Sequence, residues 1–396
     1  MPGPLSGYRI LDLTSNVSGP LATMILGDQG ADVIKVEAPD GGDATRAGGN
    51  RRAGFNASFV NNNRNKRSIV LDLKKPAAVQ ALLRIAAGAD VFVQNFRPGV
   101  AERLGVGEEA VRNARSDIIY VSISGFGEKG PYAAKPAYDP VIQGFSGLAT
   151  VQAGSDEARP RLLRTILPDK LTAITASQAI TAALLARERT GEGQHVRLSM
   201  LEAVLGFMWA SDMGDQTFIG DEPPRQTAAS AHDLIYETAD GYITAAALTD
   251  RQWAGLARAV GHPEWIEDER FRTSALRQQN IDARLELTQQ ALMTRPAAEW
   301  LERLTAAQVP CGPVLTRNQV IRHPQVEALG LVVETEHEKA GRLRQTRAAA
   351  RFSKTPTKIR RGAPGLGEHT EQILAELGYS REEIAGLRAE LVIGSG

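Results

Sequence analysis

The chain has 396 residues, of which 42% are hydrophobic and 23% charged, as is ordinary for a soluble globular protein long enough for two domains. Its 46 basic residues balance 46 acidic ones, so neither nucleic acid nor a membrane surface is expected as a partner. The single cysteine, Cys311, excludes an intrachain disulfide framework and fits a reducing compartment.

Short β-branched runs alternate with helical segments through the first half of the chain. The expected strands are Tyr8–Thr14, Ala31–Glu37, Ser68–Leu73, Asp90–Phe96, Ile118–Ser124 and Gln194–Ser199. The expected helices between them are Gly19–Gly30, Pro76–Gly88 and a long one that ends at Gly191. This alternation predicts an open, mostly parallel α/β sheet, in which ligands lie beyond the carboxyl ends of the strands.

The long helix carries one carboxylate, Asp169, at its start. We expect Asp169 to be the N-cap, because an Asp oxygen accepts hydrogen bonds from first-turn amides. The same position suits a carboxylate nucleophile that the helix N-terminus keeps ionised, and the local sequence leaves both roles open. The expected apolar stripe of this helix is Leu171, Ile174, Leu184 and Leu185.

The second half contains further helical and extended segments. The expected elements are an apolar helix at Met200–Trp209, a strand within Ala239–Leu248, helices near Gln252–Val260, Asp282–Met293 and Pro296–Ala307, and a strand at Leu331–Glu336. Cys311 lies between apolar residues and turn formers, which is typical of a buried structural cysteine.

Neither a cofactor motif nor a targeting signal is expected. We expect no dinucleotide fingerprint at Gly125-Phe126-Gly127, because we expect neither a third glycine at the right spacing nor a helix directly after it, and the chain has no P-loop. The six histidines are scattered without metal-ligand spacing. No run of about 18 apolar residues and no secretory signal are evident, so we expect a cytoplasmic protein.

Several motifs occur in a characteristic order over nearly the whole chain. They are ADVIKVEAPDGGDATR (31–46), NKRSIVLDLK (65–74), ADVFVQNFRPG (89–99), PAYDPVIQGFSGL (136–148), LPDKLTA (167–173), RTGEGQHVRLSMLEAV (189–204), VPCGPV (309–314), HPQVEALG (323–330) and LGEHTEQILAELGYS (366–380). Together they resemble the class III CoA-transferase family (CaiB/BaiF type), which formyl-CoA transferase and the carnitine CoA-transferases typify.

The resemblance implies a fold and an assembly. It implies a large Rossmann-like open-sheet domain without GxGxxG, formed by residues 1–205 together with 330–396. It further implies a linker at 206–224 and a smaller α/β domain at 225–329. Two such chains would interlock as a homodimer, so that stability would depend on dimerisation.

The resemblance also implies the chemistry. Asp169 matches the catalytic aspartate of the family, which attacks an acyl-CoA thioester and forms an aspartyl anhydride and then an aspartyl-CoA thioester. Coenzyme A or its acyl ester is then the substrate, a free carboxylic acid is the acceptor, and no metal is required. The positions expected to contact coenzyme A are Val17, Ser18, Ala38, Leu71, Asp72, Leu73, Lys74, Asn95, Phe96, Arg97, Arg103, Lys135, Tyr138 and Asp139.

The chain departs from the formyl-CoA transferase pattern at three places. Ala38 replaces an arginine, Val17 replaces a glutamine, and the region of residues 225–240 lacks the glycine-rich GGGGQ loop. Formate and oxalate are therefore not expected as substrates, and a larger acid, such as a dicarboxylate or a branched acid, fits better. The residues expected to shape its pocket are Thr227, Ser230 and His232.

Three other functions remain open. The α-methylacyl-CoA racemases of the same superfamily need a histidine directly before the aspartate that is Asp139 here, and this chain has Tyr138, a poor base at neutral pH. A non-catalytic CoA-binding protein would not need the aspartate at position 169. A nicotinamide dehydrogenase would need the dinucleotide fingerprint.

Overall fold

The computed structural model describes residues 2–220 and 234–394. Contacts divide the chain into two compact units, which are described separately below. The first unit comprises Met1–Ala231 together with Gly330–Gly396, and the second comprises His232–Leu329.

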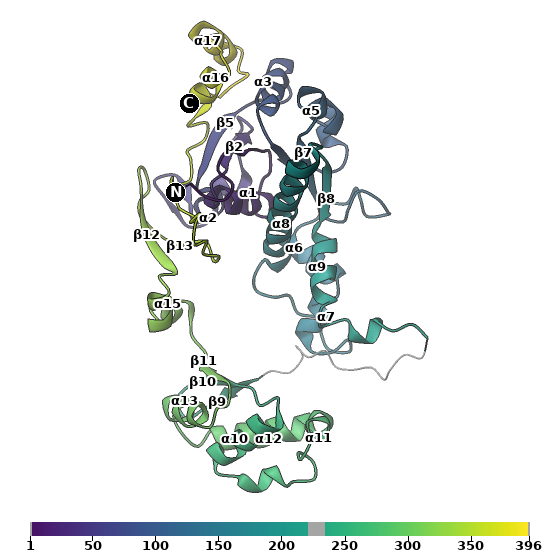
Figure 1. The fold of residues 1–396 in the computed structure, drawn as a ribbon, viewed down its shortest axis with the longest axis vertical. Coiled ribbons are helices and arrows are strands. Elements are labelled where there is room, and N and C mark those ends of the chain that lie inside the picture. The colour runs from purple at the N-terminus through teal and green to yellow at the C-terminus, as the bar shows by residue number, and fades with distance from the viewer. Residues whose placement is uncertain (1, 221–233, 395–396) are drawn as a thin grey trace. The chain divides into compact units, whose positions relative to one another are not determined.

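A six-stranded sheet forms the centre of the first unit (Figure 1), and every neighbouring pair of its strands is parallel. In sheet order the strands are β5 (Lys66–Val70), β2 (Asp32–Glu37), β1 (Arg9–Asp12), β6 (Val91–Gln94), β7 (Ile119–Ser124) and β8 (His195–Ser199). Counted along the chain, this is the 3-2-1-4-5-6 order of doubly wound sheets. The predicted parallel α/β fold is confirmed.

Helices cover both faces of this sheet. α1 (Ser18–Asp28) and α8 (Leu167–Thr190) pack on one face, in a core that includes Ile10 and Val91. α3 (Pro76–Ala87), α5 (Glu108–Ala114), α16 (Thr370–Glu376) and α17 (Arg381–Ala389) pack on the other, in a core that includes Leu11 and Phe92. Because both faces are buried, the strands are nearly continuous apolar runs, which is the pattern that the sequence shows.

The first unit has further elements around this sheet. They are β3 (Arg51–Arg52), β4 (Phe55–Asn56), α2 (Ala57–Asn63), α4 (Val100–Arg103), α6 (Asp139–Phe145), α7 (Leu148–Ala153), α9 (Met200–Met208), β12 (Val332–His337) and β13 (Gly341–Thr346), with short 3₁₀ turns at Ala44–Arg46 and Gly214–Gln216.

Strand β5 begins and ends earlier than the sequence predicted. The strand was expected at Ser68–Leu73 but runs over Lys66–Val70. Its two leading charges are neutralised inside the fold, Lys66 by Asp12 and Arg67 by Asp32, so neither interrupts the strand. The ladder ends after Leu71, because the Asp72 amide donates to Val392 O of the C-terminal segment.

The start of α8 corrects the expected N-cap. The helix begins at Leu167, so Asp169 lies inside the first turn and not at its cap. Asp139 accepts a hydrogen bond from the Asp169 amide at 3.2 Å and thus satisfies one first-turn donor itself. The expected end is confirmed, since Gly191 is the C-cap with φ 75°.

The expected apolar stripe of α8 is wrong at Ile174 and Leu185, whereas Leu184 is buried as expected. Ile174 and Leu185 are 58% and 53% exposed, whereas the buried face contains Ala173, Ala176 and Ile180. At 3.6 residues per turn these residues and Leu184 share one face, while Ile174 and Leu185 lie on another. Small side chains allow α8 to approach the sheet and α1 closely, which outweighs the greater hydrophobicity of the larger residues.

The glycine pattern after β7 also needs a correction. Gly125, Gly127 and Gly130 do have GxGxxG spacing, so the fingerprint was wrongly expected to be absent from the sequence. However, bends and turns follow, and the next helix begins only at Asp139. The pattern therefore has no helix N-terminus directly behind it to bind a pyrophosphate.

The second unit contains a three-stranded antiparallel sheet in the order β11-β10-β9. Its elements are β9 (Ile235–Glu237), β10 (Tyr242–Ala245), α10 (Asp250–Val260), α11 (Ser274–Gln279), α12 (Ile281–Leu292), α13 (Ala297–Ala306), β11 (Cys311–Pro313), α14 (Arg317–Val320) and α15 (Pro324–Ala328), with a 3₁₀ turn at Pro263–Ile266. Trp253 and Trp300 are fully buried in its core. Cys311 is only partly buried, against Leu301 O.

Of the residues expected to shape the acid pocket, Thr227, Ser230 and His232 lie outside the described residues. Among the helices that the structure describes, none is both long and apolar enough to cross a membrane.

Candidate active site

Two pockets open beyond the carboxyl ends of the sheet strands. The strand order reverses between β1 and β6, and a doubly wound sheet has its ligand crevice at such a point. The first pocket has a volume of about 240 Å³ and is called here the strand-end pocket. Its lining comprises Leu13, Thr14, Ser15, Lys35, Val36, Glu37, Ala38, Gly42, Asp43, Leu71, Asp72, Leu73, Lys74, Phe96 and Leu104.

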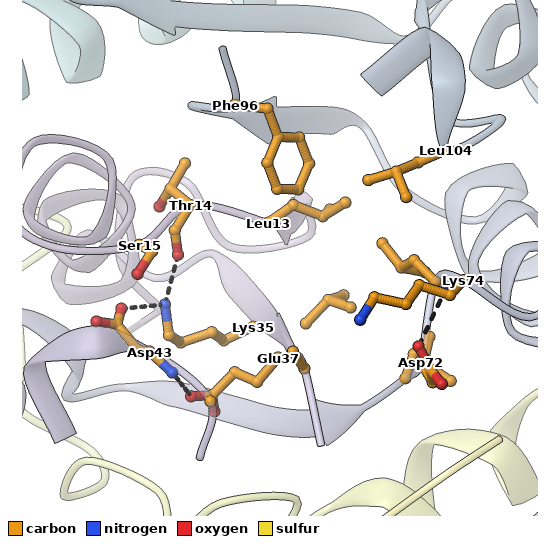
Figure 2. Close-up of a pocket in the computed structure, with 15 residues that line it drawn as sticks. Leu13, Thr14, Ser15, Lys35, Glu37, Asp43, Asp72, Lys74, Phe96 and Leu104 are labelled. Carbon is orange, nitrogen blue, oxygen red and sulfur yellow. Dashed lines mark hydrogen bonds and ion pairs between the residues drawn. The ribbon is translucent and has the colours of Figure 1, made fainter. Parts of the chain in front are cut away.

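Figure 2 shows how the strand-end pocket combines apolar and charged side chains. The Phe96 ring and the side chains of Leu13 and Leu104 gather at the top of the view. The amino group of Lys74 points toward the centre of the view from the right, below Leu104. Such a lining suits a ligand with an apolar or aromatic part and a nearby anionic group.

The second pocket, called here the Asp169 pocket, has a volume of about 200 Å³. Its lining comprises Asn16, Ser18, Asn95, Phe96, Arg97, Pro98, Ile123, Ser124, Gly125, Ala133, Lys135, Pro136, Ala137, Tyr138, Asp169 and Met200. Phe96 lines both pockets, so the turn after β6 contributes to both. The lining of this pocket therefore contains two cationic side chains, Arg97 and Lys135, as well as the Asp169 carboxylate.

Most of the residues singled out from the sequence meet at these two pockets. The strand-end pocket contains Ala38, Leu71, Asp72, Leu73, Lys74 and Phe96. The Asp169 pocket contains Ser18, Asn95, Phe96, Arg97, Lys135, Tyr138 and Asp169. Val17, Arg103 and Asp139 line neither: Val17 precedes α1, Arg103 is exposed at the end of α4, and Asp139 is buried beneath Asp169.

The surroundings of Asp169 raise the pKa of its carboxyl. Burial is the largest cause, and the neighbouring Asp139 carboxylate acts in the same direction. The Ser18 hydroxyl donates a hydrogen bond to Asp169 Oδ1 and partly opposes both effects. The sequence predicted that the helix N-terminus would keep this carboxylate ionised, but desolvation outweighs that influence here.

The β1–α1 loop is tied to the end of β6. Asn95 Oδ1 accepts from the Ser15 amide at 3.0 Å, and Asn95 Nδ2 donates to Ser15 O at 2.9 Å. Asn16 has a left-handed φ of 72°, which an asparagine tolerates better than most residues. A Cβ on Gly19 would lie 2.3 Å from Thr14 Cβ, so only glycine allows α1 to begin this close to the loop.

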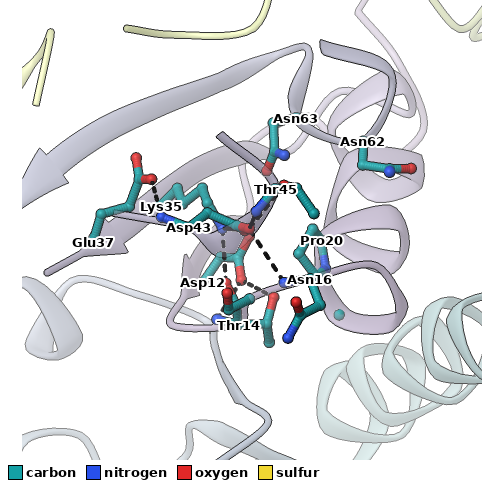
Figure 3. A network of polar contacts seen from close by, with 12 residues as sticks. Asp12, Thr14, Asn16, Pro20, Lys35, Glu37, Asp43, Thr45, Asn62 and Asn63 are labelled. Atoms are coloured by element: carbon teal, nitrogen blue, oxygen red, sulfur yellow. Dashed lines mark hydrogen bonds and ion pairs between the residues drawn. The ribbon is translucent and has the colours of Figure 1, made fainter. Parts of the chain in front are cut away.

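A buried network of charges lies under this loop (Figure 3). Lys66 Nζ lies 2.9 Å from Asp12 Oδ2, and Lys35 Nζ lies 2.9 Å from Asp43 Oδ2. All four side chains are fully inaccessible to solvent. Lys35 also donates to Thr14 O at 2.7 Å, which anchors the loop at the pocket wall.

The network is matched in charge, with two ammonium groups against two carboxylates. Burial alone would raise the pKa of Asp12, but Lys66 and Lys35 hold it well below its usual value. Burial lowers the pKa of Lys66 to about 8. Lys66 Nζ donates to Asp12, Pro20 O and Asn63 Oδ1, which uses all three ammonium protons, so the pair is ionised near neutral pH.

The Glu37 carboxylate holds another part of the strand-end pocket lining in place through its hydrogen bonds. Glu37 accepts two hydrogen bonds of 2.7 Å from Arg46, and it also accepts from the Asp43 amide at 3.0 Å. Burial favours the neutral form of Glu37, but Arg46 and Lys35 nonetheless lower its pKa. The segment that carries Ala38 is therefore fixed between β2 and these ion pairs.

Sequence reasoning missed several lining residues. They are Leu13, Thr14, Ser15, Asn16, Lys35, Glu37, Asp43, Leu104, Ser124, Gly125 and Met200. Ser15, Asn16 and Gly125 directly follow a predicted strand, and this position is the signal that would have found them. Lys35 and Asp43 gave no such signal, because an isolated charge in a sequence does not reveal its buried partner.

The arrangement can support acyl transfer. It offers one carboxylate of raised pKa, a hydroxyl donor beside it, and cations at two adjoining pockets. Within residues 2–220 and 234–394, no three His, Cys, Asp or Glu side chains are grouped to hold a metal ion.

Comparison with known proteins identifies what the chain resembles. A sequence profile described as CoA-transferase family III matches residues 5–370. The human succinyl-CoA:glutarate CoA-transferase is 34% identical over 94% of this chain and 86% of its own length. The formyl-CoA:oxalate CoA-transferase of Shigella sonnei is 32% identical over 98% of this chain and 99% of its own.

Solved structures agree with these relatives. Rv3272 from Mycobacterium tuberculosis superimposes with a TM-score of 0.82 at 32% identity, over 93% of this chain and 99% of its own. A CaiB/BaiF family protein from Brucella suis gives the same TM-score and identity, over 95% of this chain and all of its own.

Proposed function

The chain belongs to CoA-transferase family III, and from this membership we propose that it moves coenzyme A from an acyl-CoA donor to a free carboxylic acid through covalent intermediates on Asp169. The observation that carries the proposal is the position of Asp169. Its carboxylate lines a pocket at the carboxyl ends of the strands, with the Ser18 hydroxyl as a donor.

The proposed reaction has four exchanges in which no proton is consumed overall. An Asp169 carboxylate oxygen attacks the thioester carbonyl, and the C–S bond breaks to give an aspartyl anhydride and the CoA thiolate. The thiolate attacks the Asp169 carbonyl, which releases the donor acid and leaves an aspartyl-CoA thioester. The acceptor carboxylate then repeats the first exchange on that thioester, and the thiolate finally takes the acceptor acyl group and frees Asp169.

The two pockets suit the two parts of this substrate. We propose that the strand-end pocket holds part of coenzyme A, with Phe96, Leu13 and Leu104 against apolar or aromatic surface and Lys74 near an anionic group. The Asp169 pocket then holds the reacting acyl group. An anhydride is hydrolysed by water, so this pocket must exclude water once the substrate is bound.

We propose a dicarboxylic acid as the acceptor. Arg97 and Lys135 line the Asp169 pocket, so a cation is available for a carboxylate that does not react. The name of the human relative gives succinate and glutarate, which agrees in class. The test is a screen of acyl-CoA donors against mono- and dicarboxylic acceptors, and a clear preference for monocarboxylic acids would contradict the proposal.

Trapping tests the covalent step. Incubation with an acyl-CoA and hydroxylamine is expected to convert Asp169 to its hydroxamate and to inactivate the protein, and peptide mass spectrometry locates the modification. The racemase alternative predicts a different result: deuterium would enter the α-carbon of a 2-methylacyl-CoA without any acceptor acid. Such exchange would overturn the transferase proposal.

The pH dependence of the reaction gives a prediction with a definite sign. Ionised Asp169 is the nucleophile, so kcat/KM is expected to rise with pH through the pKa of this carboxyl, which burial and Asp139 raise. Ser18→Ala removes a donor to the carboxylate and is expected to move the acid limb to higher pH. Asp139→Asn removes the neighbouring charge and is expected to move it to lower pH. Shifts of equal sign in the two variants would contradict this assignment.

A further inference from the structure

A chain of four hydrogen bonds runs from the surface of the first unit to the turn that both pockets share. Glu108 Oε2 lies 2.6 Å from His195 Nδ1, and His195 Nε2 lies 2.8 Å from Ser122 Oγ. Gln94 Nε2 lies 2.9 Å from the same Ser122 oxygen, and Gln94 Oε1 accepts from the Phe96 amide at 2.7 Å. The chain thus connects α5, β8, β7 and β6 in order.

When the His195 ring is neutral, the donors and acceptors of this chain of hydrogen bonds have one consistent assignment. A backbone amide can only donate, so Gln94 presents its oxygen to Phe96 and its nitrogen to Ser122. The Ser122 oxygen then accepts from Gln94, and its hydroxyl proton is directed to His195 Nε2. His195 therefore carries its proton on Nδ1 and donates to Glu108. Every donor points toward the carboxylate, so the four bonds polarise one another.

Three of the four side chains in this hydrogen-bond chain are largely buried, and one packs against a neighbouring ring. Ser122 and Gln94 are 8% and 7% exposed, and the His195 side chain is 10% exposed. The Tyr120 ring packs edge-on against His195, with 4.9 Å between the ring centres. These residues line neither pocket, so they cannot contact a ligand there directly.

The chain of hydrogen bonds ends at the Phe96 amide, next to residues that line the two pockets. Phe96 lines both pockets, Arg97 lines the Asp169 pocket, and Asn95 holds the β1–α1 loop through Ser15. An amide fixed at Phe96 therefore fixes the direction in which the chain leaves β6. This turn presents its side chains to a ligand only while that direction is kept.

We infer that Glu108, His195, Ser122 and Gln94 form a positioning relay, which holds the Asn95–Phe96–Arg97 turn in the conformation that binds coenzyme A. The inference rests on the proposed function, because the ligand is taken to be coenzyme A. The four residues are positioning residues and not catalytic residues. Breaking the relay is therefore expected to weaken binding of the acyl-CoA and to leave the chemistry on Asp169 largely intact.

The test measures binding of free coenzyme A by calorimetry and the steady-state kinetics with an acyl-CoA. Ser122→Ala removes the middle hydroxyl and is expected to raise the Kd for coenzyme A, and the KM for the acyl-CoA, by about three- to tenfold. The kcat is expected to stay within about twofold of wild type, since the lost interaction acts equally on substrate and transition state. Ser122→Thr retains the hydroxyl and is expected to restore the wild-type constants.

A second break and a matched control complete the test. His195→Gln retains an acceptor for Ser122 but loses the link to Glu108, so it is expected to raise the Kd as well. Glu109→Gln changes the exposed carboxylate next to Glu108 in α5, which takes no part in the relay, and is expected to leave the Kd unchanged.

The outcomes separate the relay from the proposed function. Unchanged Kd in both Ser122→Ala and His195→Gln, with binding by the wild type, overturns the relay alone. A fall in kcat and in melting temperature without a change in Kd assigns these residues a purely structural role and also overturns it. If the wild type does not bind coenzyme A at all, both the relay and the proposed function fail.

Discussion

Asp169→Asn is expected to lower kcat for CoA transfer by at least about 10³-fold, the scale of losing a covalent nucleophile. The amide has nearly the shape of the carboxylate, but it cannot attack a thioester to form an anhydride. The Kd for coenzyme A is expected to stay close to wild type, because Asp169 lines only the pocket assigned to the reacting acyl group. Transfer assays and calorimetry with free coenzyme A check the two parts.

A control in the second unit accompanies this variant. Asp282→Asn changes an exposed aspartate in the first turn of α12 and is expected to leave both constants unchanged. Transfer by Asp169→Asn at a rate near that of wild type would exclude Asp169 as the nucleophile. Deamidation of the new asparagine is a source of residual activity, so the intact mass of the variant is measured beside the assay.

Lys66→Met is expected to lower the free energy of unfolding by about 3–5 kcal/mol, which is the cost of leaving a buried charge without its partner. The variant removes the ammonium that binds Asp12, Pro20 O and Asn63 and leaves the Asp12 carboxylate in a site without solvent. Urea unfolding at fixed protein concentration measures the change.

The pH dependence of this loss has a predictable sign. In the wild type the pKa of Asp12 is lowered in the folded state, so its contribution to stability is present above the unfolded pKa and is lost as pH falls through the folded pKa. In Lys66→Met this contribution is greatly reduced. The difference between the two proteins is therefore expected to shrink as the pH falls from neutral into acid.

Two companion variants sharpen the result. Arg342→Met breaks an ion pair with Glu334 in which the Arg342 side chain is 77% exposed, and it is expected to cost less than about 1 kcal/mol. The double variant Asp12→Asn, Lys66→Met removes both charges and is expected to be less destabilised than Lys66→Met alone. If the buried and exposed single variants cost the same, the network does not stabilise the fold as described.

The sheet was predictable because its evidence is local and repeated. The strands are mostly short apolar runs, and helical patterns occur between several of them, so the alternation indicates a parallel sheet without knowledge of any contact. The exact limits were less predictable. Strand β5 starts at Lys66, whose charge argues against a buried strand until its partner Asp12, 54 residues away, is known.

The predictions of Ile174 and Leu185 as core residues of α8 and of Asp169 as its N-cap failed for a related reason. Hydrophobicity favoured Ile174 and Leu185 as core residues, yet the helix buries the alanines that allow it to pack closely. The cap of this helix is equally non-local, because its first-turn donor is satisfied by Asp139, 30 residues earlier.

By itself, the sequence determined the parallel α/β fold, the family, and the short list of segments at which a ligand would be expected. These follow from hydrophobic periodicity and from motifs, and both signals depend only on residues that are close together in the sequence. Only the tertiary structure decided that these segments form two pockets joined at Phe96, that Asp169 has a raised pKa, and that buried Lys66 and Asp12 support the loop above them. Burial and charge pairing depend on groups far apart in the chain, and they become defined only when the fold brings those groups together.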